Sequence, residues 1–179
     1  LRTLPSASLD MVLTSPPFIL RDTGILAAGC VPCVAMATDC AMQSPAMPTR
    51  YPDHGSFLRR ALDYVASPAG GRRRRVALLS FGMADDPAAF LRAARRRGLT
   101  AERRWIQSPR REVPGAVHSC MEMLFHGRPG ERPDALVIDD DNYVEQATRG
   151  LQRTGLSIPR DLTVVAYCNY PTPPAAAVL

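Results

Sequence analysis

The stretch PDALVIDDDNYVEQATRGLQRTGLSIPRDLTVVAYCN, residues 133–169, decides the fold of this chain. It contains an apolar run at 135–138, an amphipathic segment that begins after an acidic turn, and a second apolar run at 162–167. A loop with a glycine and a proline separates the amphipathic segment from the second run. This order predicts a strand, a helix and a second strand, which is the repeating unit of parallel α/β sheets.

A cluster of polar residues directly follows the first of these strands: Asp139, Asp140, Asp141 and Asn142. In open α/β sheets, ligands bind outside the carboxyl ends of the strands. Carboxylates at that edge can accept charge-assisted hydrogen bonds from sugar hydroxyls, so we expect Asp140 and Asp141 to contact a ligand. The alternative is that one of these acids caps the following helix while the others are solvated.

The same stretch resembles LacI-type transcriptional regulators. That family carries P-D-A, an apolar strand and an N-D pair, which Asp140 and Asp141 match here. It then carries G-L-x-[IV]-P-x-D-[LIV]-x-V-V-G-[FY]-D-[DN], which resembles GLSIPRDLTVVAYCN. The resemblance is strong over residues 75–169 and weaker before Asp53. It implies an α/β fold of doubly wound parallel sheets, a two-lobed periplasmic-binding-protein-like sensor whose N-terminal lobe is incomplete.

The rest of the chain also alternates between apolar runs and amphipathic stretches, as a parallel α/β fold requires. We expect strands at 10–15, 31–37, 75–80 and 103–107, and helices at 19–28, 55–66, 87–97 and 115–125.

Residues 38–52 hold three prolines and no helical period, which indicates a connection between two parts of the molecule. In the resembled family the chain crosses between lobes here. We therefore expect residues 1–48 to belong to the N-terminal lobe, 49–169 to form the C-terminal lobe, and 170–179 to begin the return crossing.

The composition predicts a globular chain without membrane contact, because 46% of the 179 residues are apolar but no apolar run approaches membrane-spanning length. The start lacks both a signal-peptide pattern and an initiator methionine. We therefore expect an internal portion of a longer protein. Cys40, Cys120 and Cys168 show no disulfide spacing, which suits the reducing cytoplasm. All 22 basic residues are arginine, which excludes chemistry that needs a lysine. We expect the arginine clusters at 72–75 and 95–97 to form solvated faces.

The cysteines and histidines suggest packing rather than chemistry. Cys30 and Cys33 have the C-x-x-C spacing of redox sites, but the residues after Cys33 continue as a strand, so we expect structural packing. His118, Cys120 and His126 do not share one helix face well. We therefore expect neither a metal nor a cofactor.

Three further residues are candidate ligand contacts. Asn169 ends the last predicted strand, where the resembled family has Asp or Asn. Asp53 resembles the aspartate that opens the C-terminal lobe, although it could instead cap the helix that follows it. Trp105 could stack on a sugar face, or it could pack at the edge of the sheet.

Two departures from the family concern the effector. The effector-binding aspartate maps to Cys168, and an arginine that contacts the effector maps roughly to Asp86. The effector can therefore differ from an ordinary sugar.

The resemblance implies the effector-sensing domain of a DNA-binding transcriptional regulator. It would bind a carbohydrate or a derivative in an interlobe cleft, pair as a homodimer, and contact operator DNA through a helix-turn-helix head absent from this chain. One alternative is a periplasmic sugar-binding protein of a transport system. Another is an α/β hydrolase, since paired acids can serve hydrolysis. The chain has neither G-x-S-x-G nor G-x-G-x-x-G, so we expect no enzymatic activity.

Overall fold

The structure, a computed structural model, describes residues 12–14, 33–36, 49–50, 53–80, 87–110, 112–168 and 174–176. The chain divides into two compact units, Leu1–Asp53 and His54–Leu179. The division after Asp53 lies close to the boundary that the sequence suggests after residue 48. No helix in the described part of the chain is long and apolar enough to cross a membrane.

The first unit contains a parallel sheet of three described strands in the order β1-β2-β3, namely Val12–Thr14, Cys33–Met36 and Thr49–Arg50. The first two coincide with predicted strands, and Cys33 begins one of them. β3 was not predicted, because two residues beside prolines are too few to show an alternating pattern. The helix predicted at 19–28, Cys30 and the other residues between these strands lie outside the described residues.

The second unit is built on a four-stranded sheet in the order β5-β4-β6-β7. Its strands are β4 Val76–Leu79, β5 Ile106–Gln107, β6 Ala135–Ile138 and β7 Thr163–Ala166. Every pairing among them is parallel, which confirms the predicted α/β class.

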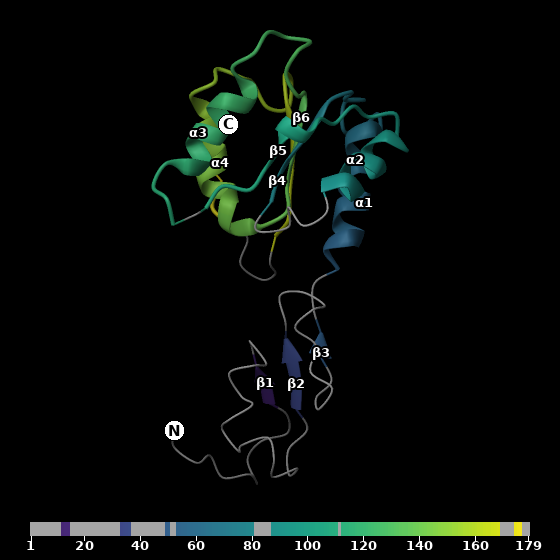
Figure 1. The fold of residues 1–179 in the computed structure, drawn as a ribbon, viewed down its shortest axis with the longest axis vertical. Coiled ribbons are helices and arrows are strands. Elements are labelled where there is room, and N and C mark those ends of the chain that lie inside the picture. Colours follow the sequence, from purple (N-terminus) through teal and green to yellow (C-terminus); the bar gives the residue numbers. More distant parts are fainter. Residues whose placement is uncertain are drawn as a thin grey trace. The chain divides into compact units, whose positions relative to one another are not determined.

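Helices cover both faces of this sheet, so it is doubly wound. α1 (His54–Ala66) and α2 (Pro87–Arg95) lie on one face, and α3 (Ala116–Phe125) and α4 (Val144–Gln152) on the other (Figure 1). Side chains alternate along a strand. In β6, Ala135 and Val137 therefore pack on the side of α1 and α2, and Leu136 and Ile138 pack on the side of α3 and α4. This two-sided burial explains why the central strands read as continuous apolar runs.

The strand predicted at 103–107 is only partly correct. Arg103–Trp105 forms a 3-10 turn, called η4, and only Ile106 and Gln107 pair with β4. The turn is closed by the Trp105 backbone N–H, which donates to the Glu102 carbonyl at 2.9 Å. Another 3-10 turn, η5 (Asp141–Tyr143), precedes α4 and contains part of the acidic cluster.

The expectation of solvated faces is wrong for several of the clustered arginines. The Arg73 side chain donates to the Thr163 hydroxyl at 2.9 Å and also to the carbonyl oxygen of Pro159, so it joins the start of β7 to the loop before it. Arg75 forms an ion pair with Asp134 at 3.3 Å. In the other cluster, Arg97 forms an ion pair with Asp63 at 2.6 Å.

The Asp134 side chain connects the start of β6 to the start of β4 through hydrogen bonds. Its Oδ1 accepts the backbone N–H of Arg74 at 3.0 Å and that of Arg75 at 2.7 Å. We expect Asp134→Ala to lower the free energy of unfolding by about 2 kcal/mol, because the variant leaves these donors without their acceptor. Urea denaturation measures this change. Asp134→Asn is the matched control: it retains an acceptor oxygen and should lose clearly less, whereas equal losses would contradict this explanation.

Candidate ligand-binding site

The ends of three neighbouring strands form one edge of the second sheet. Leu79, Ile138 and Ala166 are paired in register, so the residues that follow them lie side by side. The Asp139 N–H donates to the Leu79 carbonyl at 3.1 Å, and the Tyr167 N–H donates to the Ile138 carbonyl at 2.8 Å. We call this edge the rim, and it consists of Ser80, Asp139, Asp140, Asp141, Tyr167 and Cys168. It is the carboxyl edge, where open α/β sheets bind ligands.

Asp139 is the most deeply placed acid of the rim, with an exposed fraction of 3%. The hydroxyl of Ser80, which is itself buried, donates to its Oδ2 at 2.6 Å. Because strand side chains alternate, Ser80, Asp139 and Tyr167 continue the face that is covered by α1 and α2. This bond therefore joins the ends of β4 and β6 on that face and holds the Asp139 carboxylate in one orientation.

Asp140 acts as a cap. Its Oδ1 accepts the backbone N–H of Asn142 at 2.8 Å and the Asn142 side-chain amide at 2.7 Å. The sequence offered capping as the alternative to ligand binding, and here the capped element is the 3-10 turn η5 rather than α4 itself. Asp141 is half-buried, and its Oδ1 accepts a longer bond, 3.4 Å, from Asn142. The ligand roles of both acids stay predictions.

Two aromatic residues that sequence reasoning missed lie at the same edge. His54 begins α1, and its ring centroid is 5.4 Å from that of Tyr167. The Tyr167 ring meets Phe57 edge-on at 5.5 Å. Within the described residues, His54 Nδ1 is buried without a hydrogen-bond partner. Because an unsatisfied buried polar atom costs free energy, His54 Nδ1 is a candidate to bond a ligand hydroxyl.

The remaining predicted site residues have different positions. Asn169 and Asp86 lie outside the described residues. Asp53 is exposed and directly precedes α1, as the last residue of the first unit. Cys168 is exposed at the rim.

Trp105 is not part of the rim. It is 5% exposed and packs with the core on the α3 and α4 face. Ile106 pairs with Leu78, so Trp105 is level with Ala77, three residues before Ser80. At roughly 3.3 Å per residue, this places it about 10 Å below the level of the rim. Its stacking on a sugar face stays a prediction.

The exposed thiol of Cys168 provides a chemical probe of the rim. Burial raises the pKa of the Cys120 thiol on α3, which leaves less of the reactive thiolate at neutral pH. We expect iodoacetamide at pH 8 to alkylate Cys168 on the order of tenfold faster than Cys120. Peptide mass spectrometry over time measures both rates, and the two should converge in denaturing urea. Equal rates in the folded protein would contradict this placement of Cys168.

Comparisons with known proteins agree with this architecture. Residues 71–178 match the family model described as "Periplasmic binding protein-like domain". The chain is 42% identical over 52 residues to the lactose operon repressor of Rhizobium radiobacter, a match that covers 26% of this chain and 46% of that protein.

Solved structures show the same fold at low identity. A LacI family transcriptional regulator from Lactobacillus casei with bound sucrose has a TM-score of 0.65 and 22% identity, covering 93% of this chain and 61% of its own. A LacI family transcriptional regulator from Bifidobacterium animalis has a TM-score of 0.61 and 17% identity, and the match covers 89% of this chain and 56% of that chain. These comparisons confirm the resemblance and the fold class that the sequence predicts. The chain spans about half the length of the relatives that it matches.

Proposed function

Because the chain belongs to the periplasmic binding protein-like domain family, we propose that it is the effector-binding part of a LacI-type transcriptional regulator. The effector is a carbohydrate or a carbohydrate derivative, and it binds at the rim of the second sheet. Asp140, Asp141 and Asn169 are the proposed polar contacts there, together with Asp53. The observation that carries the proposal is the convergence of three strand ends and the start of α1 at one edge.

The chemistry of the rim suits a ligand with many hydroxyl groups. Its carboxylates accept hydrogen bonds, and bonds to ionised acceptors are the stronger kind. The Tyr167 ring offers an aromatic surface for the C–H groups of a sugar. His54 Nδ1 adds a buried polar atom whose hydrogen-bonding capacity is unused among the described residues. A donor-rich ligand would satisfy these groups together.

The partners follow from the same proposal. Operator DNA would be bound through a helix-turn-helix head outside these residues, and two copies would pair so that two half-sites are read. The protein would act in the cytoplasm, without a cofactor and without catalysing a reaction. The names of its relatives favour this role over that of a periplasmic sugar carrier or an α/β hydrolase, because they include a lactose operon repressor and LacI family regulators.

Operator release tests the regulatory role. The complete protein that contains this chain is mixed with DNA from upstream of its own gene and resolved on a native gel. We expect a shifted band whose amount changes when sucrose, glucose or lactose is added, because a ligand that prefers one conformation changes operator affinity. DNA of scrambled sequence is the control. Sugar binding without any specific DNA shift would instead favour the carrier.

A further inference from the structure

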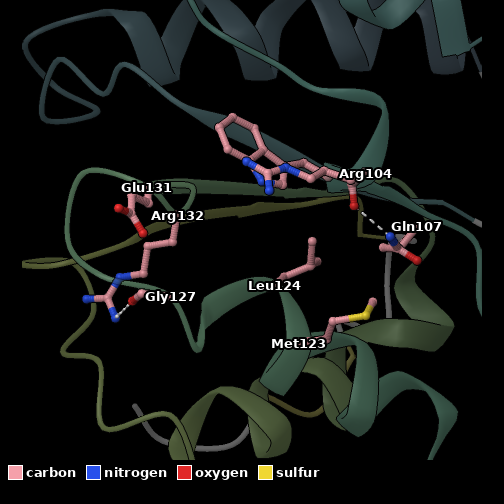
Figure 2. A pocket seen from close by; sticks show the side chains of 8 residues that line it. Arg104, Gln107, Met123, Leu124, Gly127, Glu131 and Arg132 are labelled. Atoms are coloured by element: carbon pink, nitrogen blue, oxygen red, sulfur yellow. Dashed lines mark hydrogen bonds between the residues drawn. The ribbon is translucent and has the colours of Figure 1, made fainter.

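A cavity lies on the flank of the second sheet, on the face that α3 covers. It has a volume of about 500 Å³ and is formed by η4, β5, the end of α3 and the turn that follows α3 (Figure 2). Its lining consists of Arg104, Trp105, Gln107, Met123, Leu124, Gly127, Glu131 and Arg132. We call it the side pocket. Its volume lies in the range of cavities that hold small ligands.

The side pocket has an apolar base. Trp105 and Leu124, each 5% exposed, come from the core between the sheet and α3. Met123, the neighbour of Leu124 on α3, is 62% exposed and adds a flexible thioether at the mouth. An apolar body placed here would cover the Met123 side chain and the edges of two core residues. This lining favours a flat or aromatic group over a sugar.

Two guanidinium groups give the pocket unused donors. Arg104 lies over the Trp105 ring, 5.6 Å from its centroid. Only its Nε is engaged, donating to Glu102 at 2.6 Å, so its two terminal nitrogens have no partner among the described residues. Arg132 uses one terminal nitrogen to donate to the carbonyls of Phe125 and Gly127, at 3.2 and 3.4 Å.

The acceptors of the pocket are fewer. The Gln107 amide nitrogen donates to the Arg104 carbonyl at 2.7 Å, which fixes the side chain at the pocket wall (Figure 2). Glu131 supplies the one carboxylate of the lining, on the same side as Arg132 (Figure 2). A planar guanidinium fork binds a carboxylate through two parallel bonds. An anionic group would therefore bind the two terminal nitrogens of Arg104, whose Nε already forms an ion pair with Glu102 at 2.6 Å.

We propose that the side pocket binds a small molecule with a flat apolar body and one carboxylate, with the carboxylate on Arg104 and the body between Trp105 and Met123. This site is separate from the rim and does not depend on the proposed sugar effector. It also gives Trp105 a ligand role different from the one that the sequence suggested.

The single tryptophan of the chain makes this site directly observable. The 179-residue protein is titrated with benzoate while the emission of Trp105 is recorded, and benzyl alcohol and benzylamine serve as neutral and cationic probes of similar shape. We expect a saturable change with benzoate and at least a tenfold weaker response to the other two. No saturable change with benzoate, or equal binding of all three, would overturn the proposal.

Two variants locate the binding site. Arg104→Gln should weaken benzoate binding about tenfold without a change in melting temperature, since the Arg104 side chain is 69% exposed. The matched control is Arg95→Gln, which removes an exposed arginine of α2 and should leave binding unchanged. Asp141→Ala should also leave it unchanged. A changed benzoate affinity in Asp141→Ala would place benzoate at the rim and overturn the proposal, as would unaltered binding by Arg104→Gln.

Discussion

Replacing Gly70 with alanine is expected to lower the free energy of unfolding by about 3 kcal/mol. A Cβ at this position would lie 2.1 Å from the Tyr64 carbonyl oxygen and 2.8 Å from its carbon. Both atoms belong to the backbone of α1, and that oxygen also accepts the Ser67 N–H at 3.0 Å. The clash therefore cannot be relieved by rotating a side chain, and the end of α1 must shift.

Urea denaturation of Gly70→Ala measures this loss, with Gly127→Ala as the control. A Cβ at Gly127 would make only an ordinary contact, 3.7 Å to the Arg132 Cβ, so that variant should change stability by less than about 1 kcal/mol. Similar stabilities for the two variants would show that the turn after α1 does not pack as described.

Truncating Leu136 to alanine is expected to cost about 3–4 kcal/mol of stability. Leu136 is fully buried in β6, a central strand, where it belongs to the core beneath α3 and α4. The variant loses the transfer free energy of the removed atoms. It also leaves a cavity, which the surrounding core side chains cannot fill completely. The same strand carries the acids of the rim, so its stability supports the proposed site directly.

The control for this variant is Val164→Ala on the neighbouring strand β7. Val164 packs against the same core but is only partly buried, so its truncation should cost about 1 kcal/mol. Thermal and urea unfolding of both variants provide the comparison. Equal costs would mean that β6 is not the better buried strand of the pair.

The sequence predicts β4, β6 and β7 of the second sheet well and the edge strand β5 poorly. β4 and β6 are buried on both faces, so each appears as a short run of apolar residues. β5 has only two residues, as does β3 in the first sheet, and two residues are too few to show a strand pattern. Those residues are strands because they pair with a neighbouring strand, and the sequence does not reveal that pairing.

The candidate site was predictable to the same limited extent. Asp140 and Asp141 stand out because they directly follow a buried strand, where the carboxyl edge of the sheet must be. The contact between His54 and Tyr167 arises from the packing of α1 beside β7, more than a hundred positions away in the chain, so no local pattern indicates it. Similarly, the capping role of Asp140 depends on the 3-10 turn that precedes α4.

Calorimetric titration of Asp141→Ala, together with a melting curve, tests the central claim that the rim binds the effector. The ligand is whichever of sucrose, glucose and lactose binds the unaltered protein, and Asp140→Ala is the comparison for the loss of stability that a missing cap causes. We expect Asp141→Ala to bind about 10- to 100-fold more weakly, since a hydrogen bond to a charged group is worth about 1.5–3 kcal/mol. Its melting temperature should hardly change, whereas Asp140→Ala should lose about 1 kcal/mol of stability with its cap. Unchanged sugar affinity in Asp141→Ala, with a loss of stability like that of Asp140→Ala, would contradict the proposed site.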